Sequence, residues 1–297
     1  MNLFGNGLGV ALATPFTPDE AIDTPALVRL VQHVVAGGAD FVVALGSTGE
    51  SAMLTSAERD HVVHIVREHC GNARCIVGTG ATATALAIDW TRRAAELGAD
   101  AALVVVPPYA KPTQAGIVAH FTAIARAVPT LPLVVYNVPS RVGTNLLPAT
   151  LQGLWTLPTV VAVKESSGDL QQIARIGAEL PKGKVLLAGD DPLLLPTIAV
   201  GGTGIVSVAG NVVPKAMAAL LASARRGDFA TARQQNATLL PLFEALAAEP
   251  NPIPIKCALA LAGIGEPLPR LPLQPATAGT RERLRAALHA ATEAAHA

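Results

Sequence analysis

TVVAVKESSGD, the stretch from Thr159 to Asp169, places a lysine at the end of a short apolar run. The five residues before Lys164 carry no charge and three of them are valine, so they predict a buried β-strand. Burial disfavours a charged ammonium, and a neutral amine at a strand end is a candidate Schiff-base nucleophile. The alternative is a structural lysine that reaches solvent or pairs with Glu165.

Similar apolar runs occur along most of the chain, and a longer helical pattern follows each of them. The predicted strands are Gly9–Ala13, Phe41–Leu45, Cys75–Gly78, Ala101–Val106, Leu133–Tyr136, Val160–Val163, Val185–Ala188 and Gly204–Val208. The predicted helices are Pro25–Ala36, Ala57–Cys70, Ala83–Leu97, Ala115–Ala127, Pro148–Trp155, Asp169–Glu179, Pro192–Val200 and Pro214–Arg225. Thr24 is predicted to cap the first helix, and the Thr55–Glu58 stretch offers a cap oxygen to the second.

Eight strand–helix units in this length favour an α/β fold, a closed (β/α)8 TIM barrel. The strands lack polar alternation, which is typical of a parallel sheet covered on both faces. An open doubly wound sheet is the alternative, because the number of strands does not prove closure. After Arg225 only helices are predicted, over Asp228–Ala248, Ile253–Ala262 and Thr280–Ala295. We therefore expect a catalytic barrel over residues 1–226 and a C-terminal helical region over 227–297.

The composition is typical of a globular enzyme and shows no excess of positive charge that would indicate nucleic-acid binding. The 297 residues are 51% hydrophobic and 15% charged, with 22 basic and 22 acidic side chains. The three cysteines show no spacing typical of a metal site or a disulfide framework, which favours a reducing cytoplasm. No signal peptide and no membrane span is predicted, because the N-terminus lacks a basic region and the most apolar window is broken by Pro196.

Reactive residues of such barrels lie at the carboxyl ends of the strands. The seven histidines all fall in predicted helices: His33, His61, His64, His69, His120, His289 and His296. Metal-dependent aldol chemistry would place imidazoles at the barrel mouth, so no metal and no cofactor is expected. Asp190 and Asp191 follow the seventh strand without partner acids at neighbouring strand ends, and Asp190 is expected to cap the next helix.

The strand ends instead carry a set that suits imine chemistry. Lys164 would attack a ketone, and Tyr136 would relay protons as the carbinolamine loses water. Ser47 could orient that phenol and Tyr109 could extend the relay. The alternatives are that Tyr136 is a buried tyrosine with a satisfied hydroxyl and that Ser47 is a turn residue. Arg141 has the planar fork that binds a carboxylate with two hydrogen bonds.

Several motifs, taken in order, resemble the dihydrodipicolinate synthase and N-acetylneuraminate lyase superfamily of pyruvate-using (β/α)8 enzymes. They are LATPF at Leu12, GSTGES at Gly46, GTGATAT at Gly78, PPYAKPTQ at Pro107, YNVPSRVG at Tyr136, KESSGD at Lys164, AGDD at Ala188, NPIPIK at Asn251 and RLPL at Arg270. The similarity covers nearly the whole chain, and the order and spacing of the motifs are more specific than any one of them.

The resemblance implies a role for each matching residue. Lys164 would form the pyruvate imine, Tyr136 would relay protons, and Ser47 would replace the threonine usual in the synthases. Thr48 and Ser47 would bind the pyruvate carboxylate, largely through backbone amides. The imine pocket would be lined by Val206 and Gly189. Tyr109 would act in a neighbouring subunit, which implies a homotetramer built as a dimer of dimers, with no nucleic-acid or membrane partner.

The resemblance also bears on the second substrate. Arg141 in its SRVG context and the NPIPIK segment resemble the synthases, in which the arginine receives the carboxylate of aspartate semialdehyde. This implies condensation of pyruvate with L-aspartate 4-semialdehyde to 4-hydroxy-tetrahydrodipicolinate, a step of lysine and diaminopimelate biosynthesis. GSTGE and SGDL are more common among lyase-like relatives, so an aldolase or lyase that uses a sugar aldehyde is the alternative.

Lysine-inhibited synthases carry an amide, an acid, a histidine and an aromatic residue at four positions where this chain differs. The residues found here are Thr82, Leu86, Arg59 and Pro108. Leu86 cannot pair with a lysine ammonium, and Arg59 repels it. Weak or absent feedback inhibition by lysine is therefore predicted.

Overall fold

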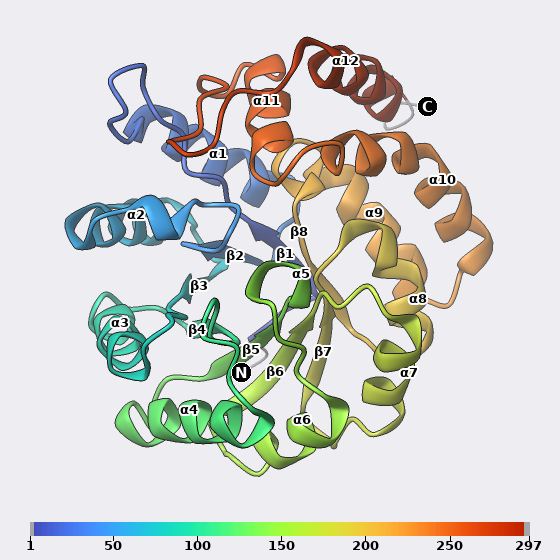
Figure 1. Ribbon diagram of the computed structural model, residues 1–297. Helices are drawn as coiled ribbons and strands as arrows, with labels where there is room; N and C mark the ends of the chain where they lie inside the picture. The colour runs from blue at the N-terminus through green and yellow to red at the C-terminus, as the bar shows by residue number, and fades with distance from the viewer. Residues whose placement is uncertain (1–2, 294–297) are drawn as a thin grey trace.

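The computed structural model describes residues 3–293, in which eight parallel strands close into a barrel surrounded by helices (Figure 1). Each strand pairs with its neighbours in chain order, and β1 pairs with β8. The strands are β1 (Leu8–Ala11), β2 (Phe41–Ala44), β3 (Arg74–Gly78), β4 (Ala101–Val105), β5 (Leu133–Asn137), β6 (Val160–Glu165), β7 (Val185–Ala188) and β8 (Gly204–Ser207). The closed (β/α)8 barrel is therefore confirmed, and the open sheet is wrong.

The helices follow the strands in the expected alternation, with three more after the barrel. They are α1 (Thr24–Ala36), α2 (Ser56–His69), α3 (Thr84–Glu96), α4 (Gln114–Ala127), α5 (Pro139–Val142), α6 (Pro148–Leu154), α7 (Leu170–Ala178), α8 (Leu194–Ala199), α9 (Pro214–Arg225), α10 (Phe229–Leu246), α11 (Ile253–Leu261) and α12 (Ala278–Glu293). Three short 3₁₀ turns are η1 (Ser51–Met53), η2 (Asp191–Leu193) and η3 (Ala209–Asn211). Helix α10 packs on α9 and α12, beside the barrel (Figure 1).

Most predicted elements differ from the structure by one or two residues at their ends. A cap oxygen in the Thr55–Glu58 stretch is confirmed, and it belongs to a capping box: Thr55 Oγ1 accepts from the Glu58 amide, and the Glu58 side chain accepts from the Thr55 amide. The cap of α1 is wrong by one residue, because the Asp23 carboxylate accepts from the Ala26 amide at 2.9 Å. Helix α5 was not predicted, since it is a single turn after Pro139.

The six histidines within the described residues all lie in helices: His33 in α1, His61, His64 and His69 in α2, His120 in α4 and His289 in α12. Residues 294–297, which include His296 and the last two positions of the predicted final helix, lie outside the described residues. Between residues 3 and 293, no helix is long and apolar enough to cross a membrane.

Candidate active site

Lys164 and Tyr136 are register partners at the carboxyl ends of β6 and β5. Their side chains are 5% and 7% exposed, and Lys164 Nζ lies 4.3 Å from the centre of the Tyr136 ring. Because the strands are parallel and adjacent, an amine and a phenol-bearing ring are brought together without any loop. A buried lysine at a strand end beside a tyrosine is the arrangement that imine chemistry requires.

The alternative that Lys164 pairs with Glu165 is wrong. Within the described residues Glu165 forms no ion pair, and its carboxylate accepts from Asn137 Nδ2 at 3.1 Å and from the Ser167 amide at 2.7 Å. Successive side chains of a strand point to opposite faces, so Glu165 points away from Lys164.

The loop after β2 brings Ser47 and Thr48 to the same end of the barrel. Two successive turn bonds shape it, from the Gly49 amide to Gly46 O and from the Glu50 amide to Ser47 O, both at 3.1 Å. The amides of Ser47 and Thr48 donate no hydrogen bond within residues 3–293. Adjacent free amides in a turn are suited to a carboxylate.

Leu45 and Glu50, which flank this loop, both adopt left-handed backbone conformations, with φ of 58° and 52°. Such conformations are strained in residues with side chains, and they concentrate at functional sites.

A cavity of about 300 Å³ opens beside Tyr136 and Ser47. Arg141, on α5, reaches its wall, and so does Asn251 from the segment before α11. Lys164 lies behind the Tyr136 ring and does not line this cavity. Three of the residues predicted at the strand ends, Tyr136, Ser47 and Arg141, therefore line one cavity.

Asn251 is a site residue whose contacts were not predicted. Its Nδ2 donates to Thr48 Oγ1 at 2.9 Å, and its backbone carbonyl accepts from Arg141 Nη2 at 2.8 Å. The only sequence signal was its place in the NPIPIK motif, which did not indicate these contacts. Asn251 thus connects Thr48, which is expected to bind the pyruvate carboxylate, to Arg141, which is expected to bind the aldehyde substrate.

Tyr109 does not join the other predicted residues within a single chain. Its side chain is 91% exposed, and its backbone is left-handed with φ of 67°. Within the described residues, the Tyr136 hydroxyl forms no hydrogen bond with Tyr109 or Ser47. Tyr109 thus presents a phenol outward from a strained loop.

Asp190 does not cap the helix that follows β7, contrary to the prediction. Its carboxylate makes no capping bond, whereas that of Asp191 accepts from the amides of Val208 and Ala209 at 3.1 and 2.9 Å. Burial raises the pKa of the Asp190 carboxyl, and the charges of Lys164 and Arg141 oppose this shift. Asp190 therefore lies within electrostatic reach of both.

Gly189 and Val206, predicted in the imine pocket, lie at the ends of β7 and β8. A Cβ on Gly189 would lie 1.8 Å from Ser166 Oγ and 3.0 Å from Glu165 O, so a side chain here would have to displace Ser166 beside the strand that carries Lys164. Val206 is buried, with 1% of its surface exposed. Neither residue lines the cavity beside Tyr136.

The sequence matches the family model described as "Dihydrodipicolinate synthetase family" over residues 5–291. The chain belongs to the dihydrodipicolinate synthetase family. A curated relative from Thermosynechococcus vestitus, named 4-hydroxy-tetrahydrodipicolinate synthase, is 48% identical over 279 residues, or 94% of each chain. A relative of the same name from Thermomicrobium roseum is 47% identical and covers 95% of this chain and 93% of its own.

Solved structures of dihydrodipicolinate synthetase family members agree with the fold. The enzyme from Thermotoga maritima superposes with a TM-score of 0.95 at 37% identity, covering 98% of this chain and 99% of its own. The chloride-inhibited enzyme from Acinetobacter baumannii, solved in complex with pyruvate, gives a TM-score of 0.94 at 38% identity, covering 97% and 99%.

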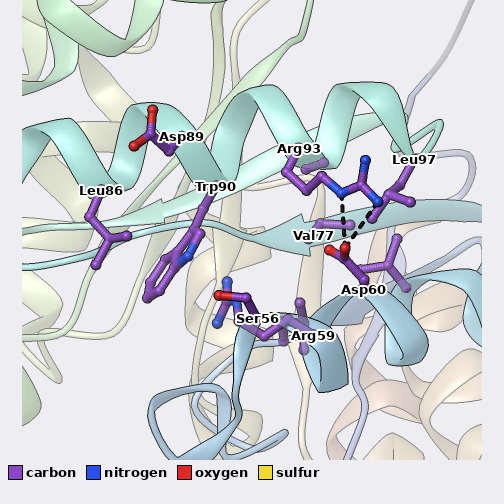
Figure 2. A pocket seen from close by; sticks show the side chains of 12 residues that line it. Ser56, Arg59, Asp60, Val77, Leu86, Asp89, Trp90, Arg93 and Leu97 are labelled. Atoms are coloured by element: carbon purple, nitrogen blue, oxygen red, sulfur yellow. Dashed lines mark hydrogen bonds and ion pairs between the residues drawn. The ribbon is translucent and has the colours of Figure 1, made fainter.

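A second cavity, of about 350 Å³, lies between α2 and α3, and two of the four residues behind the lysine-feedback prediction line it (Figure 2). The guanidinium of Arg59 stacks 3.8 Å from the centre of the Trp90 ring and donates to Gly78 O at 2.8 Å. Burial lowers the pKa of Arg59 to about 10, so the side chain remains charged at neutral pH. Leu86 lines the same cavity without offering a carboxylate (Figure 2).

The other two residues, Thr82 and Pro108, are joined by a hydrogen bond from Thr82 Oγ1 to Pro108 O at 3.2 Å. We expect no inhibition by L-lysine below about 1 mM, because Leu86 offers its ammonium no carboxylate and Arg59 repels it. The two acids that line the cavity, Asp60 and Asp89, already pair with Arg93 and Arg92. Initial rates across a lysine titration measure this, with D-lysine as the control. Stereospecific inhibition below that concentration would contradict the prediction.

Proposed function

We propose that the protein is a 4-hydroxy-tetrahydrodipicolinate synthase, which condenses pyruvate with L-aspartate 4-semialdehyde. The observation that carries the proposal is the buried Lys164 against the Tyr136 ring, beside a cavity bounded by Ser47 and Arg141. Curated relatives with that enzyme name are nearly half identical over almost the whole chain.

Catalysis begins when the Lys164 amine attacks the C2 carbonyl of pyruvate. The carbinolamine loses water to give an imine, and loss of a C3 proton gives the enamine. The enamine carbon attacks the aldehyde, forming the new carbon–carbon bond. The substrate's own amine then attacks the imine carbon, closes the ring and releases Lys164, so that one water is lost overall.

Tyr136 is the proton relay, since its ring lies against the amine that must lose and regain protons. The free amides of Ser47 and Thr48 hold the pyruvate carboxylate, and Asn251 fixes the Thr48 hydroxyl at 2.9 Å. Ser47 supplies a hydroxyl on the wall of the same cavity as Tyr136, while Gly189 and Val206 line the imine pocket. No metal or cofactor takes part, because the imine itself is the electron sink.

Tyr109 completes the relay of a neighbouring subunit in a homotetramer. This proposal is supported by its 91% exposed side chain and its strained backbone, which extend the phenol away from its own barrel. The site of one chain is then incomplete without its partner.

The proposal is tested by supplying pyruvate with a panel of aldehydes: aspartate semialdehyde, sugar aldehydes and N-acetylmannosamine. Catalytic efficiency should be at least about tenfold higher for aspartate semialdehyde than for the other aldehydes, because the Arg141 guanidinium can form two hydrogen bonds with its carboxylate. Preference for a sugar aldehyde would overturn the assignment in favour of an aldolase or lyase.

Arg141→Ala is expected to lower kcat/KM for aspartate semialdehyde by about 10- to 100-fold, the value of a charge-assisted hydrogen bond. Imine formation with pyruvate should stay near the wild-type rate, since Arg141 lies on the aldehyde side. Stopped-flow traces and steady-state kinetics separate the two effects. Arg126→Ala, at an exposed arginine of α4, serves as the control. An equal loss in both steps would contradict the role of Arg141.

A further inference from the structure

A buried polar cluster lies on the outer side of the β5 and β6 ends, behind Lys164 and Tyr136. Its four members are Asn137, Asn145, Glu165 and Gln172, called here the Asn137–Glu165 cluster. Asn137 is fully buried, while Glu165 and Gln172 are 1% and 8% exposed. The proposed reaction uses none of these side chains.

Asn137 and Glu165 are register partners one step beyond Tyr136 and Lys164. Alternation along the strands places the reacting pair on the inner face and this pair on the outer face. Asn137 Nδ2 donates to both carboxylate oxygens of Glu165 at 3.1 Å. A side-chain hydrogen bond thus joins β5 to β6 next to the reacting pair, where the backbone pairing of the two strands ends.

Glu165 is a buried carboxylate held by N–H donors from three segments. Besides Asn137 of β5, it accepts from the Ser167 amide at 2.7 Å and from Gln172 of α7 at 3.4 Å. Burial raises the pKa of Glu165, and these hydrogen bonds oppose the shift. Burying a carboxylate costs free energy, and here the hydrogen bonds from Asn137, Ser167 and Gln172 offset that cost for Glu165.

The cluster also closes the loop that carries Arg141. Asn137 Oδ1 accepts from the Leu146 amide at 2.9 Å, and its Nδ2 donates to Asn145 Oδ1 at 2.8 Å. Asn145 in turn donates to Gln172 Oε1 at 2.8 Å. The segment between Asn137 and Leu146 is therefore fastened to the strand end from which it starts.

Resting on the function proposed above, we infer that Glu165 and Asn137 are positioning residues for both halves of the reaction. Their bond holds Lys164 and Tyr136 in register for imine formation. The bonds from Asn137 to Leu146 and Asn145 hold the Arg141 loop for the aldehyde. The cluster therefore couples the two substrate sites from outside the barrel.

The test replaces Glu165 with Gln, which keeps the shape but turns one acceptor into a donor facing the Asn137 amide. The rate of borohydride trapping of pyruvate and kcat/KM for aspartate semialdehyde should both fall, by up to about 100-fold, the cost of slight misplacement of reacting groups. Asn137→Asp should do the same by placing two acceptors together. The double variant Asn137→Asp/Glu165→Gln restores one donor–acceptor pair and should recover at least about tenfold.

The matched control is Val34→Ala, a cavity variant in α1 whose side chain is fully buried. It should lower the melting temperature without changing either rate. The inference is overturned if folded Glu165→Gln behaves like this control, or if the double variant is no better than the single ones. Recovery in the double variant supports pairing, because general loss of stability does not reverse on a second substitution.

Gln172→Leu provides a milder variant in case Glu165→Gln does not fold. It removes the outer bonds of the cluster, and kcat/KM for the semialdehyde should fall by about threefold or more. An unchanged value would overturn the inference. If the wild-type chain itself traps no pyruvate, the proposed function fails. If it does trap pyruvate and the variants match it, only the positioning claim fails.

Discussion

Lys164→Ala is expected to lower turnover by about 10⁴-fold or more, because removing a covalent nucleophile abolishes the route through the imine. The side chain is 5% exposed, and within residues 3–293 it is the lysine that lies against the Tyr136 ring. Steady-state assays with pyruvate and aspartate semialdehyde measure the loss.

Two controls make the Lys164 result specific. Lys164→Arg keeps a cation at the strand end but is no nucleophile, and it should be as inactive as the alanine variant. Lys182→Ala, at an exposed lysine after α7, should leave turnover unchanged. Activity above one-tenth of wild type in Lys164→Arg would contradict imine catalysis by this residue.

The second large effect concerns stability. Lys256→Met is expected to lower the free energy of unfolding by about 3–5 kcal/mol, the cost of leaving a buried charge without its partner. Lys256 Nζ forms an ion pair with Glu50 in which the side chains are 1% and 0% exposed. It also donates to Leu268 O at 2.9 Å and lies 3.8 Å from the centre of the Phe16 ring. Burial lowers the pKa of Lys256 to about 8, opposed by Glu50.

Denaturant midpoints at one fixed protein concentration measure this loss. The double variant Glu50→Gln/Lys256→Met removes both charges and should recover most of the stability. A single variant as stable as wild type, or a double variant worse than the single, would contradict the account. Because Glu50 follows the loop that carries Ser47 and Thr48, the single variant should also weaken pyruvate binding.

The fold could be predicted from the sequence because each element is local. Runs such as Val160–Val163 and Val185–Ala188 are apolar, short and bounded by polar or glycine residues, and helical periodicity lies between them. Parallel pairing then brings strand ends to one side, which is why Lys164 and Tyr136 were predicted to converge. Two local details were missed: Asp23 rather than Thr24 caps α1, and α5 is a single helical turn. Each depends on only one or two hydrogen bonds, which the sequence pattern does not determine.

The rest of the site depends on contacts between distant parts of the chain. Asn251 meets Thr48 across 203 residues and Arg141 across 110, and no local pattern encodes such pairs. Lys256 is a further example. In the sequence it is only the last residue of the NPIPIK motif, and its ion pair with Glu50 joins two distant segments of the chain. Hydrophobic periodicity indicates which side chains are buried, but not which polar groups of two loops meet.

The account is tested most directly by mapping the pyruvate adduct after borohydride reduction of the wild-type protein. Intact mass should rise by one three-carbon adduct per chain, and peptide mapping should place it on Lys164 within TVVAVKESSGD. The adduct should be absent in Lys164→Ala. An unmodified Lys164 at saturating pyruvate, or an adduct on another lysine, would contradict the central claim.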